Sequence, residues 1–98
     1  MTLVPLTEIN DDEEFFIGTR FRIYNVGLNV QKKEDDFYEY MLTQVPGESE
    51  HLNMSNVNGH KAGYSLALVK LKIGTLVVTG KALKFSIGTK NTFLVRVS

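Results

Sequence analysis

The sequence predicts an all-β fold, a small antiparallel β-sandwich or barrel of about seven to eight strands. Apolar residues recur with a period of two in several segments, and turn residues (Asn, Gly, Pro) separate these segments. No segment shows the apolar spacing of a convincing helix. The length of 98 residues, with 43% hydrophobic and 22% charged residues, fits a single soluble domain over residues 1–98.

The first expected strand is FRIYN, residues 21–25, where Phe21 and Ile23 alternate with other side chains. Two more strands are expected at LNVQ (28–31) and DFYEYMLTQV (36–45), joined by the polar stretch KKEDD. The second of these ends at a Pro-Gly pair, which is typical of turns.

A long loop is then expected over Pro46–Ser55, with a helix over Ser49–Asn58 as the alternative. Asn58-Gly59 is a strong two-residue hairpin signal. The segment GYSLALVKLKI, residues 63–73, is apolar on both faces as far as Val69. It therefore predicts a central strand covered on both sides, although a short apolar run is also compatible with a helix.

The last two expected strands are LKFSIG (residues 83–88) and TFLVRV (92–97), separated from their neighbours by Gly-containing turns. In the first, the residues expected to face inward are Leu83, Phe85 and Ile87. In the second, the residues placed together on one apolar face are Phe93, Val95 and Val97.

The residues do not indicate an enzyme. Cysteine is absent, which excludes disulfides and thiolate metal ligands. The two histidines, His51 and His60, lie beside loop signals and outside any nucleophile motif, so we expect them on surface loops. Asp11–Glu14 lacks the spacing and central Gly of a calcium loop. We expect no catalytic residue, no metal and no cofactor.

Direct nucleic-acid binding is also not expected. The isoelectric point is near 6.7, and the bases of the second half occupy outward strand positions, as on any solvated sheet face. The aromatic residues of that half, Phe85 and Phe93, share faces with Leu, Ile and Val, which indicates core positions. The first ten residues do not resemble a secretory signal, and we expect a cytoplasmic protein.

The charge distribution is strongly asymmetric. Residues 1–50 hold all 11 acidic residues and four bases, a net charge of −7, whereas residues 51–98 hold seven bases and no acid. Acidic and basic strands that pair across a sheet would explain this asymmetry. The alternative is a protein partner of opposite charge, because local potential steers association even when the net charge is zero.

Two acidic clusters each run directly into aromatic residues, and acids beside tyrosines are typical of an anchor for a basic partner. In DFYEYML, residues 36, 38 and 40 share one strand face. The residues predicted to bind a partner are Asp11, Asp12, Glu13, Glu14, Glu34, Asp35, Asp36, Tyr38 and Tyr40.

Small cysteine-free β-rich chains with acidic clusters resemble the immunity proteins of bacterial toxin systems, with those of contact-dependent growth inhibition as the nearest type. The stretch LNMSNVNGHKAGYSLALVKLKIGTLVV, residues 52–78, carries this resemblance together with the general character of the chain. The resemblance implies a cytoplasmic protein that binds one cognate toxin, a basic nuclease domain, one to one and covers its active site. Two other classes stay open: a self-assembling interaction module, and a small enzyme or ligand-binding barrel.

Overall fold

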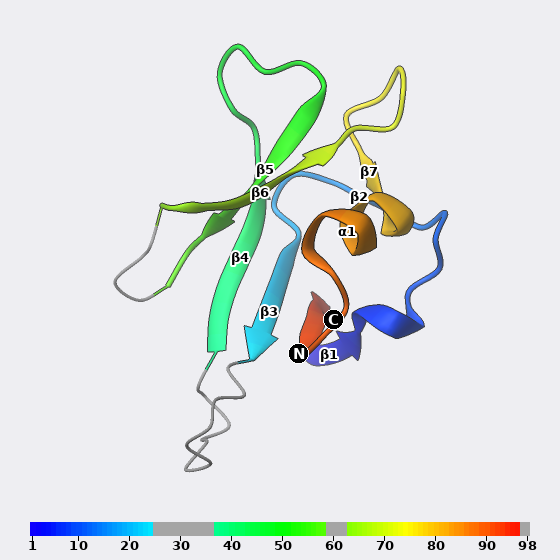
Figure 1. Ribbon diagram of the computed structural model, residues 1–98, viewed down its shortest axis with the longest axis vertical. Coiled ribbons are helices and arrows are strands. Elements are labelled where there is room, and N and C mark those ends of the chain that lie inside the picture. The colour runs from blue at the N-terminus through cyan, green and yellow to red at the C-terminus, as the bar shows by residue number, and fades with distance from the viewer. Residues whose placement is uncertain (25–36, 59–62, 97–98) are drawn as a thin grey trace.

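The computed structural model describes residues 1–24, 37–58 and 63–96 and confirms the all-β prediction. A six-stranded antiparallel sheet has the order β1-β8-β3-β4-β5-β6, and a small second sheet pairs β2 with β7. Figure 1 shows helix α1 and the β2–β7 pair together at one side of the large sheet. The elements are β1 (Thr2–Pro5), η1 (Leu6–Glu8), β2 (Glu14–Phe15), β3 (Arg20–Tyr24), β4 (Phe37–Thr43), β5 (His51–Asn56), β6 (Ser65–Lys70), β7 (Val78–Thr79), α1 (Gly80–Ile87) and β8 (Thr92–Arg96).

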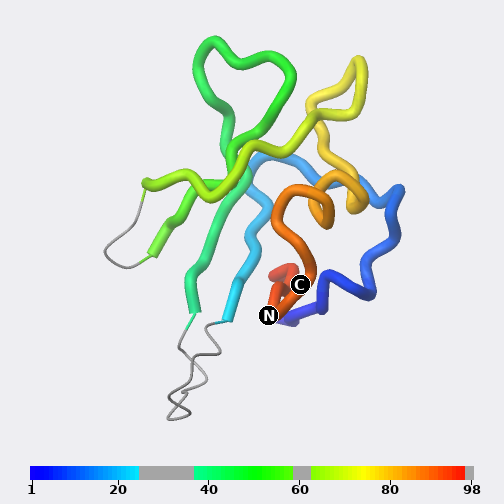
Figure 2. The backbone as a smooth tube through the Cα atoms, viewed as in Figure 1, coloured from blue at the N-terminus to red at the C-terminus, as the bar shows by residue number. Residues whose placement is uncertain are grey.

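The order of strands leaves β1 and β6 at the two edges of the large sheet. Strands β3 to β6 follow one another as antiparallel neighbours, but β8 inserts between β1 and β3. Thr2 therefore lies opposite Arg96, and Figure 2 shows the two ends of the chain side by side.

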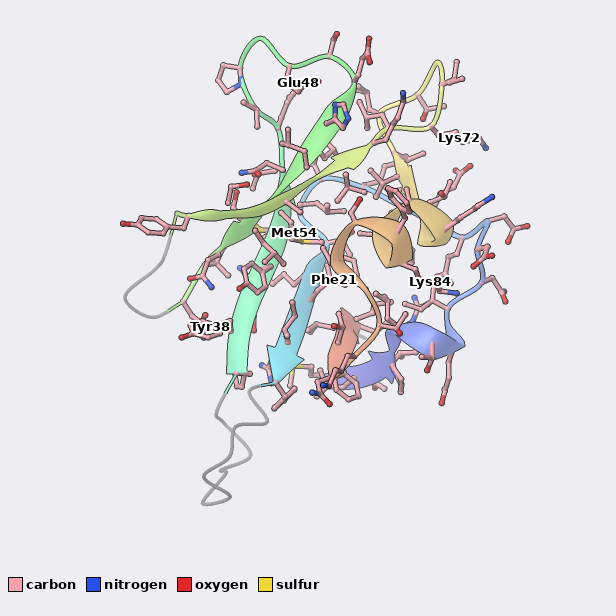
Figure 3. All side chains as sticks on the ribbon, viewed as in Figure 1. Phe21, Tyr38, Glu48, Met54, Lys72 and Lys84 are labelled. Atoms are coloured by element: carbon pink, nitrogen blue, oxygen red, sulfur yellow. The ribbon has the colours of Figure 1, made fainter. Side chains whose placement is uncertain are left out.

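One face of the sheet, here called the inner face, carries the core. Phe21, Leu42 and Leu94 project from adjacent strands and are almost completely buried. The other members of the cluster come from the N-terminal segment, from β5, from β6 and the residue after it, from β7 and from α1: Leu6, Ile9, Phe15, Leu52, Met54, Val69, Leu71, Val78 and Leu83. Figure 3 places Phe21 and Met54 near the middle of the molecule. Burial of each such side chain contributes about 1.5–3 kcal/mol.

The strand predicted over residues 83–88 is wrong, because this segment belongs to α1. Leu83 and Ile87 are four residues apart and share one helical face as readily as one strand face. Phe85, which was expected in the core, points to solvent and is 92% exposed. Gly88, with φ of 76°, ends the helix.

The segment expected to form a long loop or a helix contains β5 instead. His51–Asn56 alternates partly exposed polar side chains with buried ones, which is the pattern of a half-buried strand. In β8 the buried residues are Thr92 and Leu94, so the predicted inner face of this strand was also wrong.

Strand β6 lies at an edge of the sheet rather than in its centre. The expected double cover is therefore absent, and only the inner face of β6 is covered. The strand expected at residues 28–31, and Val97, lie outside the described residues.

Candidate protein-binding site

The acidic run at residues 11–14 is largely neutralised within the chain. Three of its four carboxylates form ion pairs with bases of the second half: Asp11 Oδ1 with Lys84 Nζ at 2.9 Å, Glu13 Oε2 with Arg96 Nη2 at 2.6 Å, and Glu14 Oε2 with Lys72 Nζ at 2.6 Å. The contact with Lys84 lowers the pKa of Asp11, and the contact with Glu14 raises the pKa of Lys72. Internal pairing thus accounts for much of the charge asymmetry.

The backbone of the same run holds the start of α1. The N–H of Gly80 donates to the Glu13 carbonyl at 2.8 Å, and the N–H of Lys81 donates to the Asp11 carbonyl at 2.9 Å. Thr79 Oγ1 accepts from the next N–H of the helix. The first-turn donors, which a helix cannot satisfy by itself, therefore all have partners. Asp12 is exposed and has no ion pair within the described part of the chain.

The predicted tyrosines lie away from the acidic run. Tyr38 and Tyr40 project from β4 on the inner-face side, as neighbours of Ile23 and Phe21. Tyr38 is exposed, whereas Tyr40 packs against the core, and burial raises its pKa. In Figure 3, Tyr38 and Lys84, the partner of Asp11, are at opposite sides of the molecule.

The acids and tyrosines therefore do not form one surface among the described residues. The predicted binding residues Glu34, Asp35 and Asp36 lie outside those residues.

The outer face of the sheet, opposite the core, has a closed polar cluster at its centre. Both carboxylate oxygens of Glu39 accept hydrogen bonds, from Arg20 at 2.8 Å and from Arg22 at 3.0 Å. The Arg22 guanidinium lies 4.1 Å from the centre of the Phe37 ring. Phe93, expected in the core, packs instead against Tyr24 on this face. The charged groups of this cluster pair with one another and its rings pack together, so we assign the cluster a structural role.

His51 lies where β5 begins, with Nδ1 3.0 Å from Oε2 of Glu48, and this contact lowers the pKa of Glu48. The pair is partly exposed and stands alone. Within residues 1–24, 37–58 and 63–96, no group of three metal-binding side chains converges. Over the same residues, no helix is long and apolar enough to span a membrane. His60 lies outside them.

An uncovered apolar surface follows β6. Leu66 and Leu68 are 42% and 48% exposed on the outer side, while Val69 is buried on the inner side. The turn that follows β6 adds Ile73 at 92% and Leu76 at 63% exposure. We call these four residues, Leu66, Leu68, Ile73 and Leu76, the β6 surface.

Two hollows flank the turn of the β6 surface. One, of about 310 Å³, lies between Ser49-Glu50 and Lys70–Thr75. The other, of about 370 Å³, lies between Gln44–Ser49 and Leu76. A larger hollow of about 550 Å³ borders β3 and β8 and is lined by none of the four residues of the β6 surface. Ile73 lines the first of the two smaller hollows and Leu76 the second, so a partner's side chains that enter them would also contact the β6 surface.

Sequence reasoning missed the β6 surface, although its signal was present. A strand that is apolar on both faces is expected to be packed against other elements on both faces. Among the described residues, β6 is packed on its inner face only. Comparisons of the chain with protein-family models, with curated proteins and with solved structures find no match.

Proposed function

We propose that this protein acts by binding another protein through the β6 surface. One observation carries the proposal: four large apolar residues of β6 and of the turn after it are open to solvent, and the two in the turn, Ile73 and Leu76, are the most exposed. Exposed apolar side chains gathered on one strand and the turn after it are typical of interaction sites, because burying them contributes about 25 cal/mol for each Å² removed from water.

We further propose that the partner is a toxin domain, which this protein neutralises in the cytoplasm as an immunity protein. Charge supports this form of the proposal. The ion pair between Glu14 and Lys72 lies one residue before Ile73, so the acidic run ends beside the β6 surface. Asp12 is exposed and lies near enough to act on the charge of Lys72, so it would form a polar rim that meets a basic nuclease.

The structure favours apolar contacts as the main source of affinity and leaves electrostatics a secondary role. Three of the four acids already interact with bases of this chain, so a basic toxin would compete with Lys72, Lys84 and Arg96 for them. A purely phosphate-like acidic surface would be weakened by that competition. We therefore expect binding that persists at high salt but is faster at low salt.

The test is capture of the partner from the native cell by immobilised protein, followed by identification of what is held. The informative variant is the double change Ile73→Asp, Leu76→Asp, and the matched control is Phe85→Asp, which alters an equally exposed apolar residue on α1. We expect one protein to be retained by the wild type and the control, and lost with the double variant.

The captured protein is then purified and assayed alone and with this protein. A toxic or nuclease activity that the wild type blocks, and the double variant does not, supports neutralisation. Equal capture by all three proteins would exclude the β6 surface. A captured partner without such activity would exclude the immunity function but leave protein binding in place.

A further inference from the structure

Among the described residues, no strand pairs with the outer backbone edge of β6, so this edge can accept another strand. In an antiparallel pair, alternate residues direct their N–H and C=O groups to the partner strand. Leu71 donates to the Glu50 carbonyl at 2.8 Å, which fixes this alternation for the pairing of β6 with β5. The N–H and C=O groups of Leu68 and Lys70 therefore point away from β5, toward the open edge.

We propose that this edge pairs with the same edge of a second copy of the chain, antiparallel and around a two-fold axis at Leu68. The pairing would join two six-stranded sheets into one continuous sheet. It uses the backbone edge of β6 and the side chain of Leu68, which belongs to the β6 surface, whereas capture of a partner is tested at Ile73 and Leu76 in the turn. Self-association and partner capture are therefore measured with different variants.

The edge is self-complementary in this arrangement. With the axis at Leu68, this leucine faces its own copy and Leu66 faces Lys70 of the other chain. On the inner side, the small residue Ala67 faces Val69. Lys70 of each copy then lies opposite the apolar side chain of Leu66 in the other copy and not opposite another lysine. No two like charges therefore face each other.

The edge also lacks the features that normally prevent such pairing. Ser65–Lys70 contains no proline and only one charged residue, at its end. A register shift near Ser55 limits the regular part of β6 to Ala67–Lys70. The opposite edge strand, β1, has only four residues and ends in Pro5, which has no N–H to donate. The net charge of zero adds no long-range repulsion between copies.

The expected dimer is weak. One pair of short strands with a few flanking side chains buries less than the roughly 1,200 Å² of a standard interface, so we expect a dissociation constant on the order of 10–100 µM. The inference is tested by sedimentation equilibrium on the intact chain from about 10 µM to about 1 mM. A reversible monomer–dimer equilibrium that stops at the dimer is expected.

Two substitutions at the axis separate strand pairing from simple apolar contact. Leu68→Ala and Leu68→Pro both remove the leucine side chain, but only proline removes the edge N–H. Because that N–H does not bond to β5, proline at this edge position should leave the monomer folded, which circular dichroism checks. We expect Leu68→Pro to raise the dissociation constant at least about tenfold above that of Leu68→Ala, since both symmetric hydrogen bonds are lost.

Leu68→Lys provides an independent variant, because it places two like charges opposite each other and should also abolish the dimer. A protein that stays monomeric at about 1 mM overturns the inference. Equal dissociation constants for Leu68→Ala and Leu68→Pro overturn edge pairing as well. Neither result bears on the proposed partner binding, which is measured with the Ile73 and Leu76 variants. That proposal fails only if these variants capture the partner as well as the wild type does.

Discussion

At Gly80, helix α1 lies directly against Ile9 and Asn10, the residues that lead into the acidic run, and replacing this glycine with alanine tests that packing. A Cβ at this position would lie 2.2 Å from the Asn10 carbonyl oxygen and 3.1 Å from Cγ2 of Ile9. Ordinary carbon–oxygen contacts are about 3.3 Å or longer. The helix and the acidic segment would therefore have to separate by about 1 Å.

That separation acts on two hydrogen bonds at once. The bonds from Gly80 to Glu13 at 2.8 Å and from Lys81 to Asp11 at 2.9 Å would both be stretched. Losing them costs about 1 kcal/mol each, and overpacking costs about 1–3 kcal/mol. The better helix propensity of alanine returns about 1 kcal/mol. We expect Gly80→Ala to lower the free energy of unfolding by about 2–4 kcal/mol.

The assay is urea unfolding followed by circular dichroism. With a slope of about 2 kcal/mol per molar urea, the middle of the usual range, the midpoint should fall by roughly 1–2 M. The control is Lys81→Ala, the next residue of the same helix, which is exposed and should change the free energy of unfolding by less than about 0.5 kcal/mol. A Gly80→Ala midpoint equal to that of this control would refute the close packing of the acidic segment against α1.

Three further predictions concern single side chains. Thr79→Ala removes the N-cap of α1 and should cost about 1 kcal/mol in urea unfolding, whereas Thr79→Ser should retain most of it. The buried amide of Asn56 lies beside the Tyr40 side chain but makes no hydrogen bond of normal geometry among the described residues, so Asn56→Leu should raise the free energy of unfolding by about 1 kcal/mol; a lower melting temperature would show instead that the Tyr40 contact stabilises the fold. Lys84 lowers the pKa of Asp11, so this carboxylate stabilises the fold above its unfolded pKa of 3.8, and the stabilisation is lost as pH falls through the lower folded value. Below about pH 4, Asp11→Asn should therefore lose less stability than the wild type as the pH falls, which acid unfolding followed by circular dichroism measures.

The role of the acidic run becomes clear only from the tertiary structure. A row of four acids in the sequence indicates a basic counterpart, but it does not say whether that counterpart lies in another protein or later in the same chain. Asp11 and Lys84 are 73 positions apart, and Glu13 and Arg96 are 83 apart. Only the packing of α1 and β8 against the N-terminal segment brings these charges together.

The sequence by itself determined the class of the fold and several strands. Alternation marked β3 and β4 because a strand with one buried face must alternate, whatever its neighbours are. The same pattern was present in β5, where turn signals nearby favoured a loop. It also determined that the chain holds no disulfide, since cysteine is absent.

Tertiary structure decided what local patterns leave ambiguous. Leu83 and Ile87 fit a strand or a helix, and the helix prevails because Glu13 and Asp11, far away in the sequence, accept its first N–H groups. The order of strands was decided by the insertion of β8 beside β1, which leaves β6 at the edge. An apolar strand sequence indicates that both faces of the strand favour burial. Only the arrangement of the whole chain determines which of the two faces stays exposed and can bind a partner.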